Sequence, residues 1–151
     1  MLVPRVHLQP TLGQLYDYLD SINTIIQSNV ASGSAVALTS TTAANVTSIT
    51  LTPGDWDVSG TVAFLPAAST SITALAGGSN ETSATIGGHH NSFVRAMAAV
   101  VPGAVGQVSP IPLHRVTVPF GTTTVLYLVA RATFTVSTLG AYGIIQARRV
   151  A

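Results

Sequence analysis

From about Gly33 to the C-terminus, the sequence is a series of short apolar or alternating segments separated by links rich in Gly, Pro, Ser and Asn. Segments of this kind, rich in Val, Ile, Thr and aromatic residues and bounded by turn residues, are typical of strands. The predicted strands are VALTS, TSITLT, WDVSGTVAF, TSITALAGG, NSFVRAMAAVV, HRVTVPF, TVLYLVARATFTV and AYGIIQARRV. Roughly eight strands over about 115 residues is the spacing of an all-β sandwich or jelly roll.

The stretch ITLTPGDWDVSGTVAF holds a turn, two aspartates and the only tryptophan. Pro53 and Gly54 predict the turn, with Asp55 as a typical turn residue. The strand that follows would place one set of residues inward: Trp56, Val58, Gly60, Val62 and Phe64. The opposite, solvated face would carry Asp57, Ser59 and Thr61. Asp55 and Asp57 would then point in different directions, which is poor geometry for a glycosidase pair.

The segment VLYLVARATF is almost continuously apolar. Such a run indicates a central strand that is covered on both faces. Arg131 interrupts it and would need either a partner or a place on an axis where chains meet.

Residues 11–30 form the only segment with a convincing helical pattern. Thr11 and Gln14 make a capping box after Pro10. Apolar residues follow at alternating spacings of three and four: Leu12, Leu15, Leu19, Ile22 and Ile26. This spacing predicts a coiled-coil seam at which helices from several chains meet on an axis, with Asn29 at the next seam position. An amphipathic helix packed on its own domain is the alternative.

The expected organisation has two parts. Residues 1–32 would comprise an extended arm, in which Pro4 and Pro10 disfavour a helix, followed by the short helix. This part would serve attachment and trimerisation. Residues 33–151 would be the β jelly-roll domain.

Composition narrows the function classes. Only 7% of the residues are charged, against about 25% in an ordinary soluble domain. Because no apolar run reaches the roughly 18–20 residues of a membrane-spanning helix, the excess apolar surface is expected to be buried against other protein chains. A net charge of +1, with no basic cluster beyond Arg148 and Arg149, argues against nucleic acid as a partner.

No catalytic constellation is apparent. The sequence has no cysteine, no G-x-S-x-G elbow and no phosphate-binding loop, so we expect no enzymatic activity and no cofactor. The GGHHN segment offers His89 and His90 as a weak candidate for a divalent-metal site where chains converge; a plain surface loop is the alternative. The remaining histidines are His7 and His114. Loops 77–92 and 101–112 are candidates for partner or glycan contacts.

Two stretches, LTPGDWDVSGTVAF and TVLYLVARATFTVSTLGAYGIIQARRV, resemble small virion proteins of tailed bacteriophages. The terminal domains of that family are trimeric jelly rolls, similar in outline to the tumour-necrosis-factor and C1q heads. The resemblance covers about residues 38–150 and implies a homotrimer, with no catalytic residues carried over. It also implies that strands VLYLVARATF and YGIIQARR lie near the subunit interface. The candidate interface residues are Tyr127, Arg131, Phe134, Arg148 and Arg149.

The function expected from this resemblance is structural. The chain would be a capsid decoration protein, or a short head fibre or spike, located in the virion and assembled in the host cytoplasm. Virion attachment would use the arm, namely Leu2, Val3, Pro4, Arg5, Val6, His7 and Leu8. Its partners would be its own copies and a phage capsid or tail protein. The alternatives are a tail-fibre tip that binds a host surface receptor, and a free lectin-like binding module.

Overall fold

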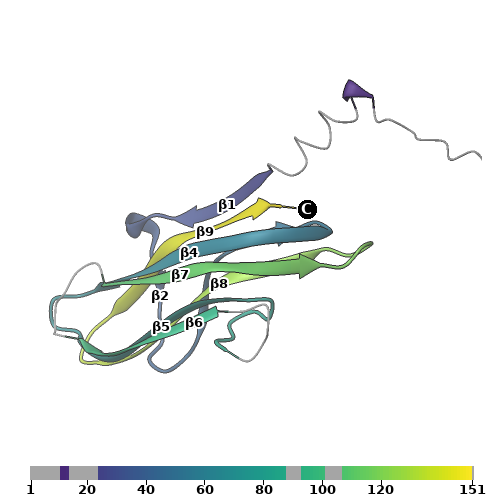
Figure 1. Ribbon diagram of the computed structural model, residues 1–151. Helices are drawn as coiled ribbons and strands as arrows, with labels where there is room; N and C mark the ends of the chain where they lie inside the picture. The colour runs from purple at the N-terminus through teal and green to yellow at the C-terminus, as the bar shows by residue number, and fades with distance from the viewer. Residues whose placement is uncertain (1–10, 14–23, 88–92, 101–106, 151) are drawn as a thin grey trace, which may run out of the picture.

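The computed structural model describes residues 11–13, 24–87, 93–100 and 107–150. Leu12 and Gly13 are helical, and from Thr24 onward the described residues form two antiparallel sheets packed face to face (Figure 1). Sheet A has the order β1-β9-β4-β7, with the short β2 also paired to β9, and sheet B has the order β3-β8-β5-β6. The prediction of an all-β sandwich is confirmed at this level.

Sheet A contains β1 (Ile25–Val30), β2 (Val36–Ala37), β4 (Gly54–Pro66), β7 (Gln107–Val118) and β9 (Leu139–Arg149). Sheet B contains β3 (Ala44–Leu51), β5 (Ser71–Asn80), β6 (Phe93–Val100) and β8 (Thr124–Thr135). A single 3-10 turn, Ser32–Ser34, follows β1. Each segment predicted to be a strand overlaps one of these strands. The boundaries differ most at β7, which begins at Gln107 and takes in the second half of the segment 101–112 that was predicted to be a loop.

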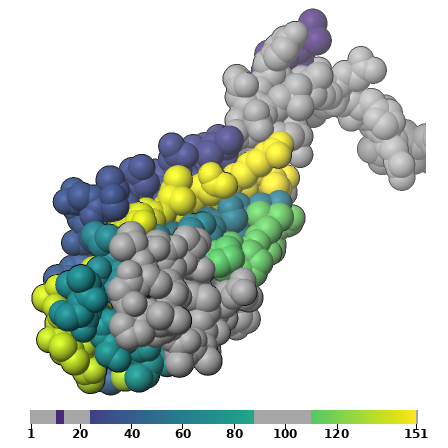
Figure 2. Space-filling view, turned by 90° about the vertical axis from the view of Figure 1, so that its left-hand side faces the viewer, coloured from purple at the N-terminus to yellow at the C-terminus, as the bar shows by residue number. Residues whose placement is uncertain are grey.

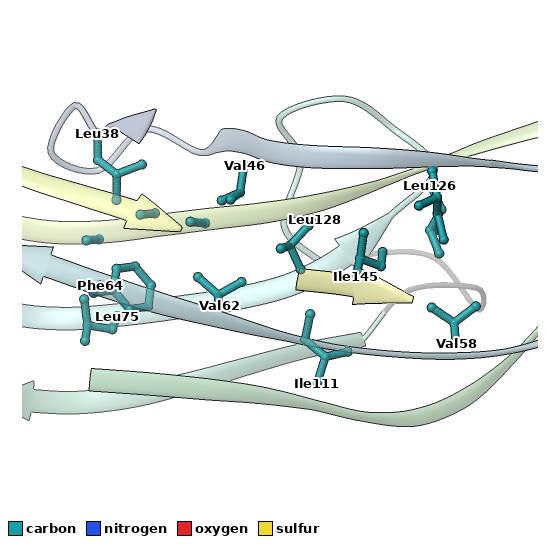
Figure 3. Close-up of a cluster of buried hydrophobic side chains, with 14 of the residues drawn as sticks. Leu38, Val46, Val58, Val62, Phe64, Leu75, Ile111, Leu126, Leu128 and Ile145 are labelled. Carbon is teal, nitrogen blue, oxygen red and sulfur yellow. The ribbon is translucent and has the colours of Figure 1, made fainter. Parts of the chain in front are cut away.

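The core lies between the two sheets (Figure 3). The alternation predicted for β4 is confirmed, because Trp56, Val58, Val62 and Phe64 are all buried. The indole N–H of Trp56 donates a 2.8 Å hydrogen bond to the carbonyl oxygen of Thr52, so the buried ring keeps its polar group satisfied.

Strand β8 pairs with both β3 and β5, as expected for a central strand. Its alternate residues, such as Leu126 and Leu128, face the core, and Val129 on the opposite side is also fully buried. Val129 lies opposite Asn45, whose side chain bonds Ser83 and Ala84 in the segment that follows β5. The prediction that β8 is covered on both faces therefore holds at Val129.

The predicted helix over residues 11–30 is wrong in its last part. Residues 25–30 form β1, which pairs with β9 from Ile25↔Arg148 to Val30↔Gly143. Ile26 and Val30 pack against the core, while Asn29 points away from it and is exposed. The β-sheet therefore begins before the boundary expected at residue 33, because burial against β9 and the strand preference of Ile and Val outweigh the helical spacing.

Both termini of the sandwich lie at one end. The amide of Arg149 donates to the carbonyl oxygen of Thr24, so the chain enters β1 beside the point where β9 leaves it (Figure 1). The turns β3–β4 and β7–β8 lie at this same end, and the β4–β5 and β8–β9 turns lie at the other. Among the described residues, no helix is long and apolar enough to cross a membrane.

Candidate functional site

A row of charged side chains crosses the outer face of sheet A, the face that points away from sheet B. Strand pairing places Ile25 of β1, Arg148 of β9, Asp57 of β4 and Arg115 of β7 side by side in this order. Nε of Arg115 donates to Oδ1 of Asp57 at 2.7 Å. In Figure 2, β1 (purple-blue) lies against β9 (yellow), with β7 (green) beyond them.

Asp55 lies on this same outer face, which corrects the expectation that Asp55 and Asp57 point apart. Strand β4 already begins at Gly54, so the two aspartates are alternate strand residues with a common direction. Each carboxylate is held by its cross-strand neighbour on β7, Asp57 by Arg115 and Asp55 by the hydroxyl of Thr117 at 2.6 Å. Both carboxylates are bonded to side chains of β7. In a glycosidase, by contrast, the two carboxylates would point at a common position, the scissile bond.

A hollow of about 240 Å³ opens over this row. Its lining residues are Ile25, Asp57, Ser59, Leu113, Gln146, Ala147 and Arg148. Two of its walls are exposed apolar side chains, Ile25 (62% exposed) and Leu113 (68% exposed). The hollow thus combines charged side chains on its floor with exposed apolar side chains at the two edges of the sheet.

The end of the sandwich that carries both termini presents a second hollow, of about 500 Å³. It is lined by Thr52, Pro53, Gly54, Val118, Phe120 and Arg149. The guanidinium of Arg149 lies 5.9 Å from the centre of the Trp56 ring and donates to the carbonyl oxygen of Pro53 at 2.8 Å. Phe120, at the tip of the β7–β8 turn, is fully exposed. This turn is closed by the Thr122 hydroxyl, which donates to the carbonyl oxygen of Pro119 at 2.8 Å.

His114 and Ser79 form a hydroxyl–imidazole pair between the two sheets, with Oγ and Nε2 3.1 Å apart. Nδ1 of His114 lies 3.2 Å from the carbonyl oxygen of Pro112. In a neutral ring this contact favours the tautomer with the hydrogen on Nδ1, since a carbonyl oxygen can only accept, and Nε2 then accepts from the serine hydroxyl. This is the order of groups in a nucleophilic pair, but Ser79 is only 1% exposed, so a substrate carbonyl cannot reach its hydroxyl. The pair acts as a polar link between the sheets.

The residues proposed for the interface are not brought together. Tyr127 and Arg131 lie on the outer side of sheet B, Phe134 is in the core, and Arg148 is on the outer face of sheet A. Arg149 turns inward to Trp56. Within the described part of the chain, the Arg131 side chain has neither an ion pair nor a hydrogen bond.

Several predicted residues lie outside the described ranges. These are the arm residues 2–8, the seam residues Leu15, Leu19 and Ile22, and the histidines His89 and His90. Of the other seam residues, Leu12 is exposed and Ile26 belongs to β1. In the described part of the chain, no group of three or more His, Cys, Asp or Glu side chains is placed to hold a metal ion.

The sequence reasoning missed the charged row and the Ser79–His114 pair. Both depend on pairs far apart in the chain: Asp57 and Arg115 are 58 residues apart, and Ser79 and His114 are 35 residues apart. An available signal was the alternation of β4 itself, because extending the strand by two residues places Asp55 beside Asp57 on the polar face.

Comparisons with known proteins give little beyond this geometry. No protein-family model matches the sequence, and no curated protein matches it significantly. A solved structure described as "Crystal structure of infectious bursal disease virus VP2 subviral particle" aligns with 85% of this chain, at 16% identity and a TM-score of 0.40. The aligned part is 31% of that chain, so the present chain spans under a third of its length.

Proposed function

We propose that this chain is a structural virion protein of a tailed bacteriophage. In this proposal it forms a homotrimeric capsid decoration protein or short head fibre, attached through its N-terminal segment. The observation that carries the proposal is that the chain enters and leaves the sandwich at one end, where Arg149 bonds Thr24. A domain held in this way has one end directed at its attachment point and the other end free to project from a particle.

Three further features support the proposal. The strand order β1-β9-β4-β7 against β3-β8-β5-β6 supports a jelly roll, because jelly rolls divide eight strands between two such sheets and are frequent in viral capsids. The low charge content and the exposed apolar residues on sheet A support burial against other chains. The resemblance of the PGDWDVSG and AYG…ARR stretches to small phage virion proteins supports the particle as the place of action.

Co-sedimentation with capsids tests the proposal. The probe is the capsid of a phage that encodes the chain, prepared without it, and the ligands are residues 1–151 and residues 24–151. The full chain is expected to sediment with the capsids, whereas residues 24–151 are expected to stay in the supernatant while keeping the circular dichroism spectrum of a β protein. Equal behaviour of the two forms, bound or unbound, would contradict attachment through the N-terminal segment.

The receptor-binding alternative makes a different prediction. A tail-fibre tip should compete with the phage for its host cells, so an excess of the pure protein should lower the number of infections. We expect no such competition from a decoration protein.

A further inference from the structure

We propose that the outer face of sheet A is the surface through which one copy of this chain docks on the next copy. This inference rests on the homotrimer of the proposed function and names the surface that would build it. It keeps Arg148 from the expectation drawn from the sequence, but it moves the interface from the outer side of β8 in sheet B to the outer face of sheet A.

The first argument is the position of the exposed apolar side chains. Ile25 lies on β1 and Leu113 on β7, and these are the two edge strands of sheet A. Both side chains line the same hollow over the outer face. A contact with a second copy would remove both apolar side chains from water.

The second argument is charge complementarity. The charged residues described on this face are two acids, Asp55 and Asp57, and two bases, Arg115 and Arg148. Arg115 neutralises Asp57, whereas Arg148 has no ion pair within the described part of the chain. In the contacts described, the carboxylate of Asp55 is bonded only to the neutral hydroxyl of Thr117. One cation on the β9 side and one carboxylate on the β4 side are thus available to a second copy.

These two arguments specify the direction of contact. The β1–β9 half of one face offers Ile25 and Arg148, and the β4–β7 half offers Leu113 and Asp55. If the β1–β9 half of one copy contacts the β4–β7 half of the next, Ile25 meets Leu113 and Arg148 meets Asp55. Such a contact is heterologous, so each copy uses one half towards each neighbour and the assembly can close as a ring. In that ring, the start of each β1 strand at Ile25 would lie at a contact between copies. The segments that precede β1 would then begin close to one another, as the predicted coiled-coil seam requires.

Light scattering after gel filtration tests the inference on the full chain. The wild-type mass is expected to be three times 15.4 kDa. The variants Leu113→Asp and Arg148→Glu are each expected to shift the mass towards 15.4 kDa at micromolar concentration, with an unchanged circular dichroism spectrum. The double variant Arg148→Glu/Asp55→Arg restores an opposite-charge pair across the contact and is expected to regain the wild-type mass.

Two matched controls lie away from this face. Arg131→Glu reverses an exposed arginine on the outer side of sheet B, and Val136→Asp places a charge on an exposed apolar residue in the β8–β9 turn. Both are expected to keep the wild-type mass. A trimeric wild type whose Leu113→Asp and Arg148→Glu variants stay trimeric overturns this surface and leaves the proposed trimer standing. A monomeric wild type overturns both.

Discussion

At the scale of single residues, Gly143 marks the closest approach between β9 and β4. Its φ is +152°, and a Cβ atom built on it would overlap the carbonyl oxygen of Thr61. Across the same strand pair, a Cβ on Gly60 would lie 2.7 Å from the carbonyl oxygen of Ile144. The two backbones can therefore pair at this distance only because neither position carries a side chain. The stretch AYG, which contributed to the phage resemblance, contains a glycine required by the sheet itself.

Gly143→Ala is expected to destabilise the fold strongly. Strain at such a backbone position costs about 1–3 kcal/mol, and the overlap with Thr61 adds to it, so we expect a melting temperature lower by roughly 5–10 °C. Thermal unfolding followed by circular dichroism measures the change. Gly33→Ala is the matched control, since a Cβ at Gly33 meets nothing within 4 Å and should shift stability by less than about 0.5 kcal/mol. Similar melting temperatures for the two variants would show that the β4–β9 pair can separate without cost.

At the scale of elements, β1 shows where sequence reasoning reached its limit. The β4 strand was predictable because its alternation of Trp56, Val58, Val62 and Phe64 with polar residues spans a long continuous stretch. In IIQSNV the alternation is short, and Ile26 also fits the spacing of the Leu and Ile residues before it. The choice between helix and strand was decided by pairing with β9, more than a hundred residues later, which no local pattern records.

The functional surface was less predictable than the fold for a related reason. The sequence shows that Asp57, Arg115 and Arg148 are charged. Whether they become neighbours depends on which strands pair and in which register. A boundary error of two residues at the start of β4 was enough to separate Asp55 from Asp57. The exposed positions of Ile25 and Leu113 required the whole sheet to be assembled.

Truncation tests the contribution of β1. Residues 24–151 keep β1, whereas residues 33–151 lose it, together with the packing of Ile26 and Val30 on the core. Because these two side chains are partly buried, their loss should lower the free energy of unfolding by roughly 2–4 kcal/mol, and the β9 edge would also lose its hydrogen-bonded neighbour. Urea unfolding at equal protein concentration compares the two forms. Equal unfolding midpoints would mean that β1 adds nothing to the sandwich.

At the scale of the whole molecule, the position of the termini orients the domain. The end with Thr24, Arg149 and the exposed Phe120 is the end from which the N-terminal segment departs, so in the proposed decoration protein it faces the particle (Figure 1). The β4–β5 turn lies at the opposite end and would face outward. The preformed turn that presents Phe120 would then lie within reach of the capsid surface.

The lack of cysteine in the sequence allows this orientation to be tested with a single introduced thiol. Ser69→Cys places it in the β4–β5 turn and Thr123→Cys places it next to β8 in the β7–β8 turn, both at exposed positions. Each thiol is coupled to a large polyethylene glycol maleimide, and capsid co-sedimentation is measured before and after coupling. We expect the polymer at residue 123 to reduce binding at least tenfold, because it would occupy the space between the domain and the particle, and the polymer at residue 69 to leave binding unchanged. The reverse order would mean that the domain points its other end at the capsid, and equal losses would mean that it lies on its side.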